Sequence, residues 1–150
     1  MKRQEALDKM FLMLEMHNVF TTPTFAKDIL NLVETDINKF IEKFSKDMIR
    51  NNLKDYKKYE RLRLTSSQSK KLDGNSLFRY EYRNSTNLRC IYLIIDENTN
   101  KRTLLLNAFN EDENKTKGKN SYNFNIERAI KIYQSIKLKE RGFRYDGYRL

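Results

Sequence analysis

Cysteine and histidine are nearly missing from this chain of 150 residues, which has one of each, Cys90 and His17. A single cysteine cannot form an internal disulfide, so the fold must depend on its core, and a reducing compartment is indicated. With so few of these residues, we expect no zinc site, no Cys/His dyad and no Ser/His/Asp triad. Gly118-Lys119 lacks the upstream glycine of a phosphate-binding loop. The sequence therefore indicates no cofactor.

Glycine, proline and long apolar runs are also scarce. The chain has 4 Gly and 1 Pro, and 39% of its residues are hydrophobic, a composition typical of a folded protein. No stretch approaches the roughly 18 apolar residues of a membrane span, and the acidic residues Glu5, Asp8 and Glu15 interrupt any signal-peptide pattern. We expect a single domain over residues 1–150, located in the cytoplasm and not bound to a membrane.

Positive charge is concentrated in the second part of the chain. Residues 1–60 have 11 Lys/Arg and 10 Asp/Glu, whereas residues 61–150 have 19 and 10, so nearly all of the net charge of +10 belongs to residues 61–150. Lysine and arginine contacts to phosphate supply most of the non-specific affinity of proteins for nucleic acids. The charge therefore favours a polyphosphate partner, and the alternative is a surface that only promotes solubility.

Apolar spacing of three and four residues predicts helices in the first 60 residues. The first predicted helix spans 2–16. A short second helix follows near the only proline, with Thr22 or Thr24 as its expected cap, and a long third helix begins at Asp36 and continues toward residue 59. A further helix is predicted to begin near residue 123, where Asn123 or Asn125 is the expected cap.

Strand patterns follow residue 61. Segments 61–65, 77–83, 88–95 and 102–109 alternate or are continuously apolar, and segment 77–83 (LFRYEYR) places its aromatic residues on one face and Arg79, Glu81 and Arg83 on the other. The expected fold class is α+β: N-terminal helices packed on one face of a small twisted antiparallel sheet, then a C-terminal helix and a short tail over 140–150. The arginine-bearing face is expected to remain open to a partner.

The cationic and tyrosine side chains of the second part suit RNA cleavage without a metal ion. In that reaction the 2′-hydroxyl attacks its own phosphate, and fixed cations stabilise the charge that gathers on the phosphoryl oxygens. A Tyr or Lys among other cations has a lowered pKa and can accept a proton. For each candidate residue, a solvated surface role is the alternative.

Five segments between residues 70 and 135 resemble, in order, the RelE/HigB-like toxins of the RelE/ParE superfamily of type II toxin–antitoxin systems. They are KLDG at 71–74, LFRYEYR ending in Arg83, LRCIYLI with Arg89, LLLNAF ending in Phe109 with a lysine-rich loop after it, and the helix start NIERAIKIY. The resemblance implies a RelE/ParE-like sheet packed on N-terminal helices. It also implies cleavage of mRNA on the ribosome, and an acidic antitoxin that covers the basic face.

The resemblance and the charge pattern together give the candidate site residues. The candidate catalytic residues are Arg83, Arg89, Lys115, Lys117 and Tyr145. The candidate RNA-binding residues are Arg79, Lys119, Tyr122, Arg144, Tyr148 and Arg149. Arg83 and Arg89 would hold phosphate, a loop lysine would stabilise charge or act as a base, and Tyr145 or Tyr122 would act as acid or base.

The segment after Phe109 departs from the family pattern. Asn110-Glu111-Asp112-Glu113 precedes the first loop lysine, where the family usually has lysines directly. The superfamily also contains members that inhibit gyrase and cleave no RNA, so the fold alone does not decide the activity. Three hypotheses follow: a ribosome-dependent mRNA-cleaving toxin, a non-catalytic inhibitor or binding module, and a phage-borne or defence-associated protein that uses a basic sheet for binding. The oligomeric state stays open.

Overall fold

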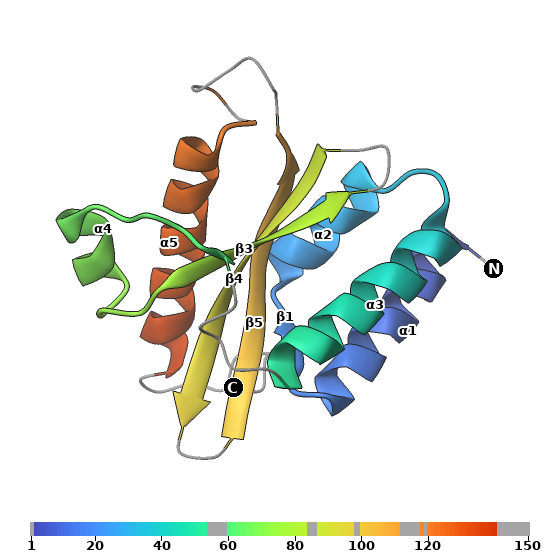
Figure 1. Cartoon of the computed structure of the whole chain (residues 1–150), viewed down its shortest axis with the longest axis horizontal. Helices are drawn as coiled ribbons and strands as arrows, with labels where there is room; N and C mark the ends of the chain where they lie inside the picture. The colour runs from blue at the N-terminus through green and yellow to red at the C-terminus, as the bar shows by residue number, and fades with distance from the viewer. Residues whose placement is uncertain are drawn as a thin grey trace.

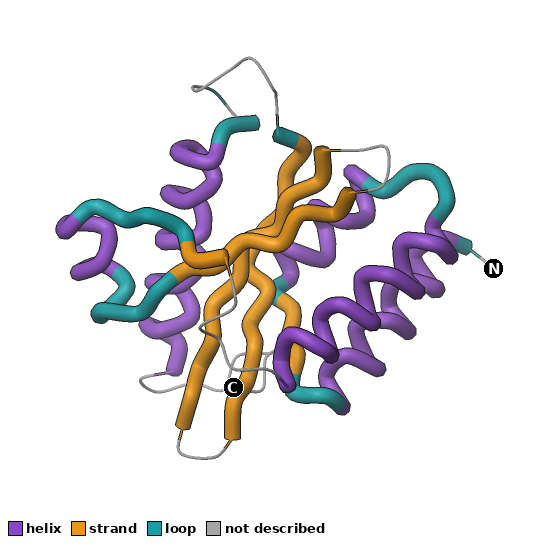
Figure 2. The backbone as a smooth tube through the Cα atoms, in the orientation of Figure 1, coloured by secondary structure: helices purple, strands orange, loops and turns teal. Residues whose placement is uncertain are grey.

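The computed structural model describes residues 2–53, 60–83, 87–97, 100–111, 118 and 120–140. The described residues form ten elements. Figure 1 shows their arrangement, with labels on all but β2, and Figure 2 colours the chain by secondary structure. In chain order they are α1 (Arg3–Met16), β1 (Val19–Thr21), α2 (Pro23–Leu32), α3 (Ile37–Leu53), β2 (Glu60–Arg61), α4 (Ser66–Lys71), β3 (Leu77–Arg83), β4 (Asn87–Glu97), β5 (Asn100–Asn110) and α5 (Tyr122–Glu140). The expected α+β class, with N-terminal helices and a C-terminal helix on the sheet, is confirmed.

The sheet has five strands in the order β1-β5-β4-β3-β2. The meander β3-β4-β5 and the short β2 pair antiparallel, as expected, but β1 pairs parallel to β5. The expectation of a purely antiparallel sheet is therefore wrong. Strand β1 has only three residues between α1 and Pro23, which is too short to produce a recognisable alternating pattern.

Helices cover both faces of the sheet (Figure 1). Helices α1, α2 and α3 cover one apolar cluster on one face of the sheet. This cluster includes Phe78, Tyr80 and Tyr82 of β3. Helix α5 buries the second cluster on the opposite face, together with Ile91 and Leu104. The expectation that the arginine-bearing face is left open is therefore wrong for the larger part of that face.

Local sequence signals explain where several helices begin. Thr22 caps α2 because its hydroxyl accepts the Phe25 N–H at 3.0 Å, and it also donates to Leu106 O of β5 at 2.6 Å, which ties the helix start to the sheet. The predicted caps of the last helix are wrong: the Ser121 hydroxyl accepts the Phe124 N–H at 3.1 Å, whereas Asn125 is buried inside α5. In the described residues, no helix has the length and apolar character needed to cross a membrane.

A bulge in β5 places the side chain of Asn107 on the face of the sheet that α5 covers. Ile91 pairs with Asn107 and Tyr92 with Leu105, so Leu106 is the additional residue. Asn107 therefore points to the α5 face, where its Nδ2 donates to Asn125 O at 3.1 Å. The edge of β5 continues beyond the end of the short strand β1. There the Ala108 N–H donates to the Asp28 carboxylate of α2 at 3.0 Å, so this backbone group has an acceptor without a neighbouring strand.

Candidate functional site

A row of alternating charges crosses the sheet on the face that α5 partly covers. Arg79 of β3 bonds Glu60 of β2 and lies 3.7 Å from Glu81, and Arg89 of β4 bonds Glu111 at 3.0 Å and lies 4.0 Å from Glu81. The antiparallel register produces this order, because Glu60 is opposite Arg79 and Glu81 is opposite Arg89. We call these five residues the charge row. Two guanidinium groups in it face three carboxylates.

Burial decreases from the middle of the charge row to its ends. The side chains of Arg89 and Glu81 are 13% and 16% exposed, whereas those of Arg79 and Glu60 are 38% and 53% exposed. The hydrogen bond with Glu60 raises the pKa of Arg79. Because the middle pair is largely shielded from water, removing one partner of the Arg89 contacts should destabilise the fold more than removing one partner of the outer contacts.

Tyr122, the first residue of α5, lies against the charge row. The Arg79 guanidinium carbon is 5.6 Å from the centroid of its ring, and the Phe109 ring contacts it edge-on at 5.0 Å. The Tyr122 hydroxyl is buried and has no hydrogen-bond partner in the described part of the chain. Burial raises the pKa of Tyr122, although Arg79 lowers it in part. The phenol therefore stays protonated at neutral pH and is not a ready base.

Two other titratable groups near the site, Tyr80 and Cys90, belong to the core. Tyr80 is 9% exposed and donates to Asp47 of α3, and its pKa is raised by burial and by this hydrogen bond. Cys90 is fully buried in β4, and burial raises the pKa of its thiol. Both groups are buried, so neither lies at a surface where it would meet a substrate.

Three of the eleven candidate site residues come together. Arg79, Arg89 and Tyr122 lie on one face, but carboxylates engage both arginines. Arg83 ends β3 opposite Asn87, and its side chain lies outside the described residues. The other candidates also lie outside the described residues: Lys115, Lys117, Lys119, Arg144, Tyr145, Tyr148 and Arg149.

The sequence does not predict which carboxylates pair with the arginines of the charge row. Glu60 falls in the segment predicted to be helical, and Glu111 stands in the acidic run after Phe109, for which intramolecular ion pairs are one interpretation. The alternation Arg79-Tyr80-Glu81 was a signal for Glu81, because it places the two charges on the same face. In the described ranges, no three His, Cys, Asp or Glu side chains gather as a metal site requires.

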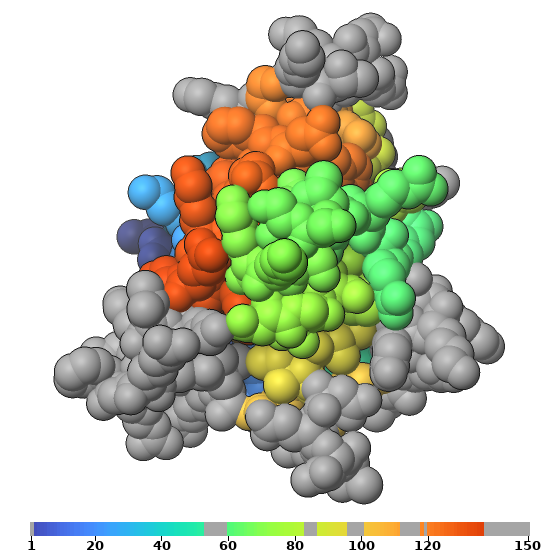
Figure 3. All heavy atoms as spheres, turned by 90° about the vertical axis from the view of Figure 1, so that its left-hand side faces the viewer, coloured from blue at the N-terminus to red at the C-terminus, as the bar shows by residue number. Residues whose placement is uncertain are grey.

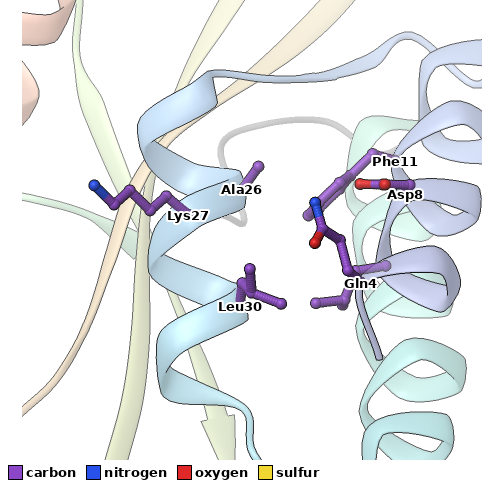
Figure 4. Close-up of a pocket in the computed structure, with 7 residues that line it drawn as sticks. Gln4, Asp8, Phe11, Ala26, Lys27 and Leu30 are labelled. Atoms are coloured by element: carbon purple, nitrogen blue, oxygen red, sulfur yellow. The ribbon is translucent and has the colours of Figure 1, made fainter. Parts of the chain in front are cut away.

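A groove between α1 and α2 is a second feature of the surface. It has a volume of about 270 Å³, and Leu7, Phe11, Ala26 and Leu30 form its apolar lining (Figure 4). Its polar lining residues, Gln4, Asp8 and Lys27, offer no pair of groups arranged for proton transfer. The charge row is therefore the stronger candidate site.

Comparison of the chain with protein-family models, with curated proteins and with solved structures found no match.

Proposed function

We propose that this protein is a non-catalytic binding module for an RNA-containing target. The observation that carries the proposal is the state of the two described sheet arginines, Arg79 and Arg89, which are both held by carboxylates. A catalytic guanidinium has to face the phosphate whose developing charge it stabilises. With Glu81 and Glu111 on either side, Arg89 has little capacity left for a phosphate. The excess charge of +10 still favours a polyanionic target.

The absence of a suitable proton acceptor in the charge row supports binding without cleavage. Attack by a 2′-hydroxyl needs a group that accepts its proton near neutral pH. Tyr122 has a pKa raised by burial, and Tyr80 is a buried donor to Asp47. Among the described residues of the row, the carboxylates that remain are ion-paired to arginine.

A RelE/ParE-like relationship is part of the same proposal. An antiparallel meander, β3-β4-β5, followed by a helix and preceded by helices supports it. The parallel strand β1 is a difference from the antiparallel sheet that the resemblance implies. An acidic partner protein, as in toxin–antitoxin pairs, would complement the positive charge of this chain.

The test combines a binding assay and a cleavage assay on the same purified protein. Binding of fluorescent RNA and of ribosomes is measured by anisotropy and sedimentation, and the 5′ ends of an mRNA under translation are mapped with and without the protein. We expect binding and an intact message. The proposal would be overturned if wild type produces new 5′ ends and Arg89→Met abolishes them. Arg50→Met, a substitution of an exposed arginine, is the control and should leave any such cleavage unchanged.

RNA cleavage is the second candidate function, and one observation favours it. Arg79, Arg89 and Tyr122 share one face of the sheet, and Glu111 directly precedes the segment that contains Lys115 and Lys117. A rearrangement that moved Glu111 away would leave the Arg89 guanidinium able to bind a phosphate. The same mapping of 5′ ends separates the two candidates, because only this second function produces cut RNA.

A further inference from the structure

A second group of cations lies outside the charge row. Residues 61–72 contain Arg61, Arg63, Lys70 and Lys71 and no acidic residue, and all four side chains are exposed. Helix α4, which contains Lys70 and Lys71, packs beside α5, whose Lys131 is also exposed (Figure 3). We call Arg63, Lys70, Lys71 and Lys131 the α4 surface. Arg61 is not part of it, because its side chain lies over the Phe78 ring, which belongs to the apolar cluster on the other face of the sheet.

The cations of the α4 surface form no ion pair with any described residue. Among the residues that the structure describes, no carboxylate lies within 4.0 Å of any of the four. In this part of the chain they therefore differ from Arg79 and Arg89, because each can meet a ligand without breaking an ion pair with a described carboxylate.

The α4 surface is also held in a fixed position. Thr65 and Gln68 form a reciprocal capping box at the start of α4, and Leu72 at its end is fully buried. Gln68 then donates to Glu127 of α5 at 3.0 Å, and the Tyr133 hydroxyl of α5 donates to Asp73 at 2.7 Å. Glu127 and Asp73 thus each accept a hydrogen bond from a neutral group, and neither forms an ion pair with a described cation of the α4 surface.

The chemistry of the α4 surface fits a phosphodiester backbone better than a membrane or a protein. Among the described residues, the exposed large hydrophobic side chains are Leu12, Met16 and Phe124, and none belongs to this surface. Membrane insertion and the buried cores of protein interfaces both use such side chains. The exposed hydroxyls of Ser66 and Ser67 add donors of the kind that contact phosphate and sugar.

We propose that the α4 surface binds the phosphate backbone of a nucleic-acid duplex. A duplex fits better than a single strand, because single strands are bound by stacking on exposed aromatic rings and this surface has none in its described residues. This inference rests on the proposed function and names the residues through which the target is bound. Backbone contacts of this kind give affinity with little dependence on base sequence.

The experiment measures duplex binding by the full chain as a function of salt. Fluorescent RNA and DNA duplexes of one sequence, a single-stranded RNA and anionic vesicles are titrated with wild type, Lys70→Gln/Lys71→Gln and the matched control Lys39→Gln/Lys46→Gln. The control removes two exposed cations of α3. Each lost phosphate contact should lower the salt slope by about 0.9, which corresponds to about 8-fold weaker binding at about 0.1 M salt relative to 1 M.

The expected result is duplex binding that weakens about 60-fold in Lys70→Gln/Lys71→Gln, if both lysines contact phosphate, and much less in the control. Preference for the RNA or the DNA duplex identifies the source of the phosphates. Equal weakening in both double variants, or binding to vesicles and not to duplexes, overturns the inference. Wild type that binds RNA while the α4 variants behave as wild type overturns it and leaves the proposed function standing. Wild type that binds no nucleic acid overturns both.

Discussion

Arg89 provides the most informative perturbation of the charge row. The Arg89→Met substitution keeps most of the aliphatic stem and removes the charge, so Glu111 loses its arginine partner and Glu81 keeps only the Arg79 contact among the ion pairs of the charge row. Breaking a fully buried ion pair costs about 3–5 kcal/mol. The Glu111 side chain is 32% exposed and retains part of its hydration, so we expect the free energy of unfolding to fall by about 2 kcal/mol.

Denaturant unfolding followed by circular dichroism measures this loss. Arg50→Met, an exposed substitution on α3, is the control and should stay within about 0.5 kcal/mol of wild type. The double variant Arg89→Met/Glu111→Gln should recover about 1 kcal/mol of the loss, because it also removes the carboxylate whose arginine partner is lost. An Arg89→Met protein as stable as wild type would refute the reasoning. It would mean that the guanidinium is free to hold a phosphate.

Three further predictions concern buried groups. The Cys90 thiol, whose pKa burial raises, should not react with a thiol reagent in the native protein and should react in denaturant; reaction at equal rates would contradict its burial. The pKa values of Tyr80 and Tyr122 are raised above 10.0 mainly by burial, so their stabilising contribution is complete below pH 10 and is lost as the pH rises above it. Unfolding measured against pH should show this decline. Tyrosinate absorbance in which the native Tyr80 and Tyr122 phenols titrate with an ordinary pKa would contradict it. Asp28→Ala should cost about 2 kcal/mol in denaturant unfolding, because the Ala108 N–H loses its acceptor, and an unchanged midpoint would contradict that role.

The sequence was sufficient for the elements whose pattern is strong. Segment 77–83 alternates with period two, and the structure places Phe78, Tyr80 and Tyr82 in the core on the face opposite Arg79 and Glu81. Thr22 was one of two expected caps and is the cap observed. In both cases the signal lies within a few neighbouring residues, where period and side-chain chemistry decide the local structure.

Features that depend on contacts distant in sequence were not predicted. Helix α4 has no apolar period, and only Thr65-Ser-Ser-Gln68 marks its start. The parallel pairing of β1 with β5 joins residues more than 80 positions apart, which no local pattern encodes. The charge row depends on the register of β3 and β4, so the compensation of Arg89 becomes visible only when strands are paired.

The central claim is that nucleic acid meets the α4 surface and not the charge row. The most direct measurement is a titration of isotope-labelled protein with an RNA duplex, followed by backbone amide chemical shifts. We predict that the shifts concentrate in residues 63–72 and around Lys131, while the amides of Arg79, Arg89 and Tyr122 change little. Shifts concentrated at Arg79, Arg89 and Tyr122 would contradict the claim and would identify the sheet arginines as the phosphate-binding groups.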